Sequence, residues 1–395
     1  MILGAFLTWL HLLNSANALT EEQKYIDKVL ESGYTEEATA AFWKLSLSET
    51  ENKLIELESR KDVHEVDIIA TDSLYTVLVR LMTLHDQTAA SLIKKHPYFK
   101  KSDASDTEPV YFSRLEIGTS GYAIQEAYHN ILSFSSNGVR IAQLWNVLKR
   151  KIVPFESKLS KEKSRIVYFL PARGSLSTDF IGLVLRPLLD LTEIWVTLVS
   201  ALLKEKSKVP TAIGINYVSP RLPVTLSQTA LEKSLDTGFS TIERFIFWRA
   251  EIQLMIADVS ALDSADFSME KISFVNSQAT NAVYALFFRI FAFFDMTSKL
   301  VNVKNNARLR VVSIEFKEFT SNGISIRSVW NGIKHVRMPP IDTSYSERDA
   351  RIIYRLPSSG KLSEDITGSI LNPLILLLEK WIEEVIYSIQ FPFDH

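Results

Sequence analysis

The sequence predicts an all-α protein built from two tandem, homologous helical-bundle domains. Three observations support this prediction. Long apolar segments with few turn-forming residues recur along the chain, much of the second half of the sequence repeats the first, and six of the seven tryptophans fall into pairs at matching places. A chain of 395 residues is also long enough for two ordinary domains. We therefore interpret the chain as an internal duplication.

The repeat is clearest towards the end of each copy. Residues 165–195, RIVYFLPARGSLSTDFIGLVLRPLLDLTEIW, align without a gap to residues 351–381, RIIYRLPSSGKLSEDITGSILNPLILLLEKW, and 16 of the 31 positions are identical. Upstream, SNGVRIAQLWN at 136–146 matches SNGISIRSVWN at 321–331. The paired tryptophans, which we expect to anchor the two cores, are Trp43 with Trp248, Trp145 with Trp330, and Trp195 with Trp381.

We expect the first copy at residues 19–205 and the second at 225–395. Between them, residues 206–224 contain three prolines and little helical character, which is typical of a linker. Each copy is predicted to form a bundle of about five to seven helices.

Residues 1–18 have the layout of a secretory signal peptide, an apolar run followed by Ala-Asn-Ala. A buried N-terminal helix is the alternative. The apolar run is shorter than the ~20 residues that a bilayer-spanning helix needs, so we expect no transmembrane span. The signal peptide predicts a secreted, extracellular protein. The chain has no Cys and no N-x-[ST] acceptor, so the fold depends on packing without disulfides or N-linked glycans.

Within each copy, Thr35 or Ser240 is expected to begin a helix that carries a buried Phe-Trp pair, and a long apolar segment follows it. The Ser-Asn-Gly motif is predicted to begin the next helix. RIVYFLP and RIIYRLP are compatible with a strand or with a helix end. The last helix follows Ser177 or Ser363, and a bend is expected at Pro187 or Pro373.

The repeated SNG frame contains two paired positions that do not lie on the core face of its predicted helix. Val139 and Asn146 share a flank two turns apart, as do Ile324 and Asn331 in the second copy. This flank is a candidate binding surface or a contact between the copies. A second neighbouring helix could equally cover it.

The C-terminal unit of each copy holds an arginine and an aspartate at the same spacing. Asp179 and Asp365 are expected in the first helical turn, where a carboxylate favours the helix dipole. Arg165 with Asp179, and Arg351 with Asp365, are predicted to form structural ion pairs. A catalytic pair of Asp179 with Glu193 is excluded, because a continuous helix would hold them ~21 Å apart.

Residues 282–296, AVYALFFRIFAFFDM, are apolar nearly all round and are interrupted by Arg289. The matching segment of the first copy also contains an arginine, Arg80. Such a helix is either a central core helix or one wall of an apolar ligand pocket. The residues of the candidate pocket are Tyr284, Phe287, Phe288, Phe291 and Phe294.

The sequence contains no catalytic or metal-ligating pattern. Thiolate chemistry is excluded, the histidines have no ligand spacing, and phosphate-loop, dinucleotide and nucleophile-elbow motifs are absent from the sequence. A net charge of -2 argues against nucleic-acid binding. We therefore expect no enzyme, cofactor or metal, but a secreted, non-catalytic interaction or structural protein that binds an unknown extracellular protein. The alternative is a carrier of an apolar ligand or lipid.

Overall fold

The structure of the protein is a computed structural model. The residues described are 21–26, 36–63, 67–95, 100–101, 115–116, 122–148, 153–170, 179–204, 228–236, 241–264, 277–303, 305–335, 341–356 and 365–391. The predicted signal peptide and the predicted linker lie outside them.

The first half of the chain contains long helices and short strand pairs. Its elements are α2 (Glu36–Ser59), α3 (Ile68–Lys95), β1 (Lys100–Lys101), β2 (Leu115–Glu116), α4 (Tyr122–Ser133), β3 (Ser135–Ser136), β4 (Val139–Arg140), α5 (Ile141–Leu148), β5 (Glu156–Ser160), β6 (Arg165–Phe169), the π-helical turn η3 (Ile181–Leu185) and α6 (Arg186–Lys204).

From α8 onward, the second half presents the same order of elements as the first half does from α2 onward, without a counterpart of β1 and β2 among the described residues. Its elements are α7 (Gln228–Asp236), α8 (Thr241–Ser264), α9 (Ser277–Ser298), α10 (Ala307–Lys317), β7 (Thr320–Ser321), β8 (Ile324–Ser325), α11 (Ile326–His335), β9 (Asp342–Ser346), β10 (Arg351–Arg355), η5 (Thr367–Leu371) and α12 (Asn372–Gln390).

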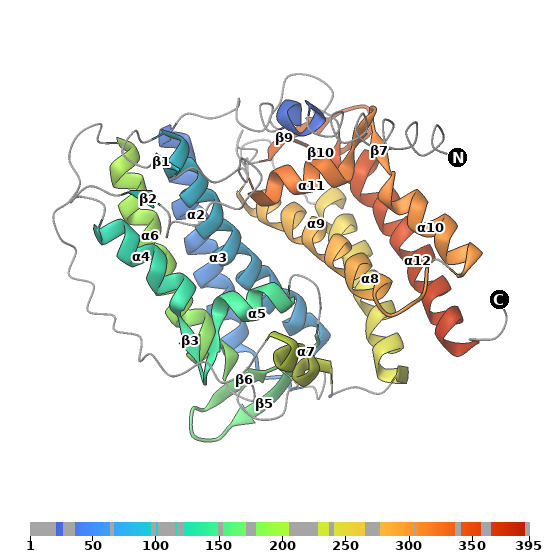
Figure 1. Ribbon diagram of the computed structural model, residues 1–395, viewed down its shortest axis with the longest axis horizontal. Coiled ribbons are helices and arrows are strands. Elements are labelled where there is room, and N and C mark those ends of the chain that lie inside the picture. Colours follow the sequence, from blue (N-terminus) through green and yellow to red (C-terminus); the bar gives the residue numbers. More distant parts are fainter. Residues whose placement is uncertain are drawn as a thin grey trace, which may run out of the picture.

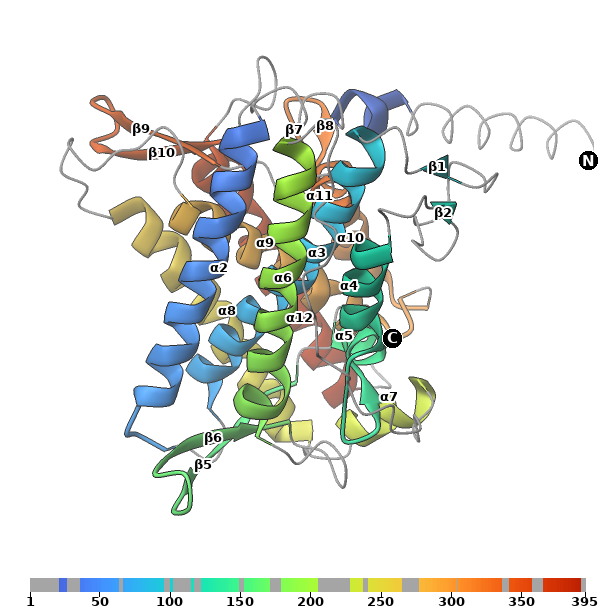
Figure 2. The ribbon, with the colours of Figure 1, turned by 90° about the vertical axis from the view of Figure 1, so that its left-hand side faces the viewer.

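The two halves lie side by side, with α3 and α9 facing each other at their boundary (Figure 1). The hairpins β5–β6 and β9–β10 lie at opposite ends of the molecule (Figure 2). Helix α9 also packs against α2, and α11 packs against α3. Apolar residues of both halves form one continuous hydrophobic cluster. The two halves therefore share one hydrophobic core.

Ser-Asn-Gly does not begin a helix, as the sequence analysis predicted, but forms the tip of a β-hairpin. Strands β3 and β4 pair in antiparallel register, Ser136 opposite Val139, and only Asn137 and Gly138 connect them. Their φ angles are +51° and +78°, and Asn322 and Gly323 repeat them with +52° and +75°. Two left-handed residues are what a two-residue type I′ turn requires, and Asn-Gly supplies them at low cost. The helices α5 and α11 begin directly after the second strand.

The segments RIVYF and RIIYR are strands, which settles the open alternative of the sequence analysis. β6 pairs antiparallel with β5, and β10 pairs with β9. The hydroxyl of Tyr168 in β6 donates to the carbonyl of Leu57 at 2.9 Å, and Tyr354 in β10 donates to Leu262 at 2.7 Å. Each hairpin is thereby fixed to the end of α2 or α8. The fold is mostly helical with only small strand pairs, so the all-α prediction holds for the main body.

The two predicted ion pairs are confirmed, and each aspartate also caps the helix that follows. Arg165 Nη2 lies 2.5 Å from Asp179 Oδ2, and Arg351 pairs with Asp365 in the same way. Asp179 Oδ1 accepts from the backbone N–H of Gly182 at 3.1 Å. A carboxylate at this place satisfies a free amide and favours the helix dipole.

At the two prolines for which a bend was predicted, the structure has a π-helical turn in both halves. Pro187 is the second residue of α6, and α6 directly follows η3. At the junction, the N–H of Arg186 donates to Ile181 O. Pro373 has the same place after η5. Proline lacks the N–H of a regular turn and its ring crowds the preceding carbonyl, and a wider turn accommodates both effects.

Candidate binding site

A cavity of about 330 Å³ lies between the two halves, lined by residues of α2, α3, α8, α9 and β10. Its lining combines small and apolar side chains of α8 and α9 with charged side chains from α2, α3, α8 and α9. The charged lining residues are Lys53, Asp72, Arg80, Asp258 and Arg289. The volume is within the size range of small-molecule sites in proteins.

Arg289 is the central charge of this site. Its side chain is 3% exposed, and its partner Glu251 is 1% exposed. Arg289 Nε donates to Glu251 Oε1 at 2.7 Å, and Nη1 donates to Asp258 Oδ2 at 2.6 Å. Nη1 also lies 2.8 Å from Asp72 Oδ1, which belongs to the other half. Burial alone would lower the pKa of Arg289, but the carboxylates, Glu251 foremost, outweigh it and raise the pKa.

Asp72 is a carboxylate of this cluster with a raised pKa. Burial raises its pKa from 3.8 to about 6, and Arg289 and Lys53 only partly oppose this shift. The neighbouring charges of Glu251 and Asp258 raise the pKa further. Three carboxylates, two from α8 and one from α3, therefore surround one guanidinium.

Arg80 has the same place in α3 that Arg289 has in α9, the thirteenth residue of the helix. Among the residues that the structure describes, no group forms a hydrogen bond or ion pair with the Arg80 guanidinium, and its Nε is buried without a partner. Burial lowers its pKa to about 10, although Glu49 and Asp72 act in the opposite direction. Arg80 is therefore still charged at neutral pH, with its charge uncompensated by a direct contact.

The difference between the two arginines has a simple cause in the sequence. Helices α2 and α8 are both 24 residues long, and Ser46 and Lys53 stand where α8 has Glu251 and Asp258. Asn281 stands in α9 where α3 has Asp72. All three carboxylates around Arg289 are thus replaced by neutral or basic residues around Arg80. Asn281 instead donates to Glu49 Oε2 at 2.5 Å.

The five aromatic residues of the predicted apolar pocket lie in the core. All are buried, and three of the rings stack on other aromatic rings. Phe288 stacks on Trp145 with 5.4 Å between centroids, Phe291 on Trp330 at 5.4 Å, and Phe294 on Phe316 at 4.1 Å. Tyr284 and Phe287 are 2% and 0% exposed. The cavity lies along another side of α9, which bears Ala282, Ala285 and Arg289.

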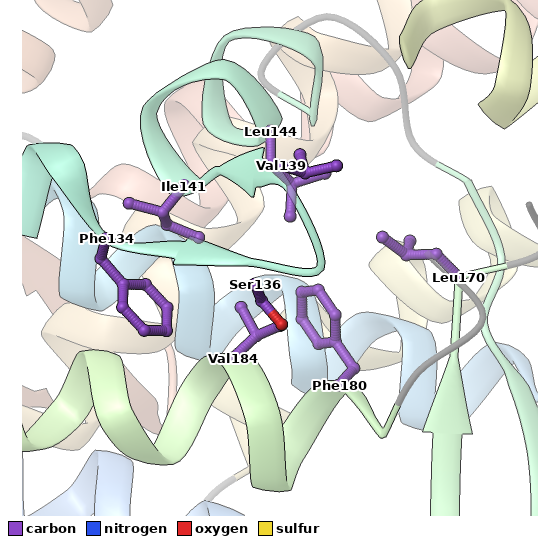
Figure 3. Close-up of a pocket in the computed structure, with 8 residues that line it drawn as sticks. All are labelled: Phe134, Ser136, Val139, Ile141, Leu144, Leu170, Phe180 and Val184. Carbon is purple, nitrogen blue, oxygen red and sulfur yellow. The ribbon is translucent and has the colours of Figure 1, made fainter. Parts of the chain in front are cut away.

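The four residues of the candidate binding surface do not form one exposed face. Val139 and Ile324 are each 3% exposed, whereas Asn146 is exposed and Asn331 is half-buried. Val139 lies in an apolar pocket with Phe134, Leu144 and Phe180 (Figure 3). This pocket of about 10 Å³ has room for about one water molecule. It is a packing gap between the β3–β4 hairpin and the segment that contains η3.

All six paired tryptophans are buried, at 0 to 8% exposure. Two of them form matching hydrogen bonds. The indole N–H of Trp195 donates to Thr88 Oγ1, and that of Trp381 donates to Thr297 Oγ1 at 2.7 Å. Trp145 reaches across the boundary to α9. The tryptophans therefore serve as the structural anchors of both halves.

Other features of the described residues point to no second site. They contain no group of three or more His, Asp or Glu that could hold a metal ion. A groove of about 330 Å³ between α2 and α6 lies within one half and is lined by residues that include Glu51, Asp190 and Glu193. In the described part of the chain, one helix, at Ala279–Ser298, is long and apolar enough to cross a membrane, and 83% of the apolar window within it is buried inside the protein. Such burial is typical of a core helix.

Comparison with known proteins found no matching family model, no similar curated protein and no similar solved structure.

The sequence shows that Arg80 and Arg289 have matching positions in the two halves. It predicted neither the cavity nor the three carboxylates around Arg289. A signal was available, because Arg289 interrupts an otherwise apolar segment. A charged residue inside an apolar segment needs a buried partner, and here the partners come from two other helices, α3 and α8.

Proposed function

We propose that this protein is a secreted, non-catalytic binding protein made of two copies of one helical unit. A small ligand occupies the cavity between the copies. The observation that supports this function best is the cavity of about 330 Å³ beside a charged guanidinium, Arg80, that has no bonded partner within the described part of the chain.

The two-copy organisation is supported by contacts that recur at matching positions. The Trp–Thr bond, the Tyr–carbonyl bond and the Arg–Asp pair each occur once in either half. Thr71 accepts from the N–H of Phe155 at 2.7 Å, and Thr280 accepts from that of Ile341 at 2.7 Å. Recurrent polar contacts of this kind support a duplicated unit more strongly than a shared helical composition does.

Secretion rests on the apolar run and the Ala-Asn-Ala pattern at the N-terminus. Expression of the full chain in a secreting cell tests it. We expect the protein in the medium, with a new N-terminus at Leu19 by Edman sequencing. An intact N-terminus on protein that stays inside the cell would contradict the proposal.

The ligand function is tested by filling the cavity. Ala282→Leu places a larger side chain in the cavity wall, and Ala41→Leu makes the same change on an exposed part of α2 outside the cavity. Native mass spectrometry of protein purified from a secreting host is expected to show a co-purified ligand for wild type and Ala41→Leu, but not for Ala282→Leu. Ligand retained by Ala282→Leu would place it elsewhere.

The alternative function, carriage of an apolar ligand among the aromatic rings of α9, has less support. Phe288 and Phe291 stack on Trp145 and Trp330, and Phe294 stacks on Phe316, so an apolar molecule would have to displace well-packed contacts.

A further inference from the structure

Three cationic residues line the cavity. Of these, Arg80 alone has a side chain with no bonded acceptor among the residues described. Arg289 is engaged by Glu251, Asp258 and Asp72, and Lys53 lies 3.0 Å from Glu56 at the surface. Arg80 is half-buried and its Nε is buried without an acceptor, which raises the free energy of the folded state. An acceptor supplied from outside the chain would remove this penalty.

The substitutions around Arg80 favour an anionic acceptor. Ser46, Lys53 and Asn281 occupy the places that hold carboxylates around Arg289. The nearest carboxylates, Glu49 and Asp72, act on Arg80 only through space. A guanidinium offers a planar fork of N–H donors that matches the oxygens of a carboxylate or phosphate.

The rest of the cavity defines the body of the ligand. Ala279, Ala282, Ala285 and Leu286 of α9 and Leu262 of α8 form an apolar wall with small side chains. Such a wall leaves room for an aliphatic group of a ligand. A fully polar group would make few favourable contacts with it.

We propose that the cavity binds a small organic anion, whose oxyanion group is held by Arg80 and whose aliphatic body lies along the alanine-rich side of α9. This inference rests on the ligand-binding function proposed above. A carboxylate and a phosphate monoester share the chemistry that Arg80 recognises.

Four probes with the same eight-carbon chain test the proposal: octanoate, octyl phosphate, 1-octanol and octylamine. Binding to the full chain is measured by isothermal titration calorimetry. Arg80→Gln removes the charged fork, and Arg249→Gln makes the same change in an exposed ion pair outside the cavity. The unfolding midpoint in urea checks that each variant is folded.

We expect wild type and Arg249→Gln to bind one of the two anions more tightly than the neutral and cationic probes. Arg80→Gln should weaken this anion by about tenfold or more, because hydrogen bonds to a charged group contribute on that scale. Its affinity for 1-octanol should not change. Preference for octanoate or for octyl phosphate decides between the two kinds of anion.

Two results overturn the inference, and they are distinguishable. If 1-octanol or octylamine binds wild type as tightly as the anions, or if Arg80→Gln keeps full affinity, the anion assignment is wrong while the ligand cavity stands. If none of the four probes binds, the anion assignment and the ligand function for molecules of this size both fail.

Discussion

Gly182 lies so close to Asp179 that a β-carbon at its position would be 2.6 Å from Asp179 Oδ2. It would also be 2.9 Å from Arg165 Nη2. Gly368 has the same relationship to Asp365 and Arg351, at 2.5 and 3.0 Å. A β-carbon at either glycine would therefore require the ion pair to shift.

Gly182→Ala should lower the free energy of unfolding by about 1–3 kcal/mol, because the ion pair must shift or the helix start must distort. In an ordinary helix the same change would be stabilising by about 0.5–1 kcal/mol. The sign of the effect in urea unfolding is thus decisive. Leu183→Ala, at an exposed neighbour, is the control. A more stable Gly182→Ala variant would mean that the ion pair yields without cost.

The aligned sequences predicted the Arg–Asp pairs because both members and their spacing recur in the two copies. The hairpins at Ser-Asn-Gly were missed for a physical reason. Strands β3 and β4 are two residues each, too short for the alternating pattern that identifies a strand. Asn-Gly itself was the available signal, since it favours a type I′ turn over a helix start.

Thr88→Val should destabilise the protein by about 1–3 kcal/mol, because it leaves the buried indole N–H of Trp195 without an acceptor. Thr297→Val should have a similar effect through Trp381. Thr192 is the matched control, because it is equally buried and its hydroxyl donates to the carbonyl of Leu188. We expect Thr192→Val to cost clearly less in chemical denaturation. Equal costs at the three positions would show that the indole bonds add nothing to stability.

Glu251→Gln should reduce the free energy of unfolding by about 3–5 kcal/mol, the usual effect of removing one partner from a buried ion pair. Glu383→Gln in the exposed pair with Arg249 should cost about 1 kcal/mol or less. The midpoints of urea unfolding at a constant m-value compare them. A small effect at Glu251 would indicate that Asp258 and Asp72 suffice to hold Arg289.

The cavity could not be predicted from sequence, because its walls come from helices far apart in the chain. Apolar periodicity identifies each helix but not its neighbour across a boundary. Arg80 is the instructive case. Its environment is known only once α2, α3 and α9 are placed together, when Lys53 and Asn281 are seen to take the places of carboxylates. The aromatic side of α9 looked more like a pocket in sequence, but tryptophans from α5 and α11 fill that space.

Asp72 should make stability fall as pH rises through the range in which it ionises. Its pKa is about 6 in the folded protein against 3.8 for an ordinary aspartate. Between these values the folded state binds more protons than the unfolded state, so the free energy of unfolding decreases with increasing pH. The stabilisation is fully present below the unfolded pKa and is lost above the folded one.

Asp72→Asn removes this titration, and the difference between wild type and variant isolates it from Asp179 and Glu383, whose lowered pKa values act in the opposite direction. Urea unfolding of both proteins at a series of pH values from about 4 to about 7 measures the difference. We expect wild type to lose stability relative to Asp72→Asn across this range. A difference that is constant with pH would mean that the Asp72 pKa is the same in the folded and unfolded states, and that Arg289 fully offsets its burial.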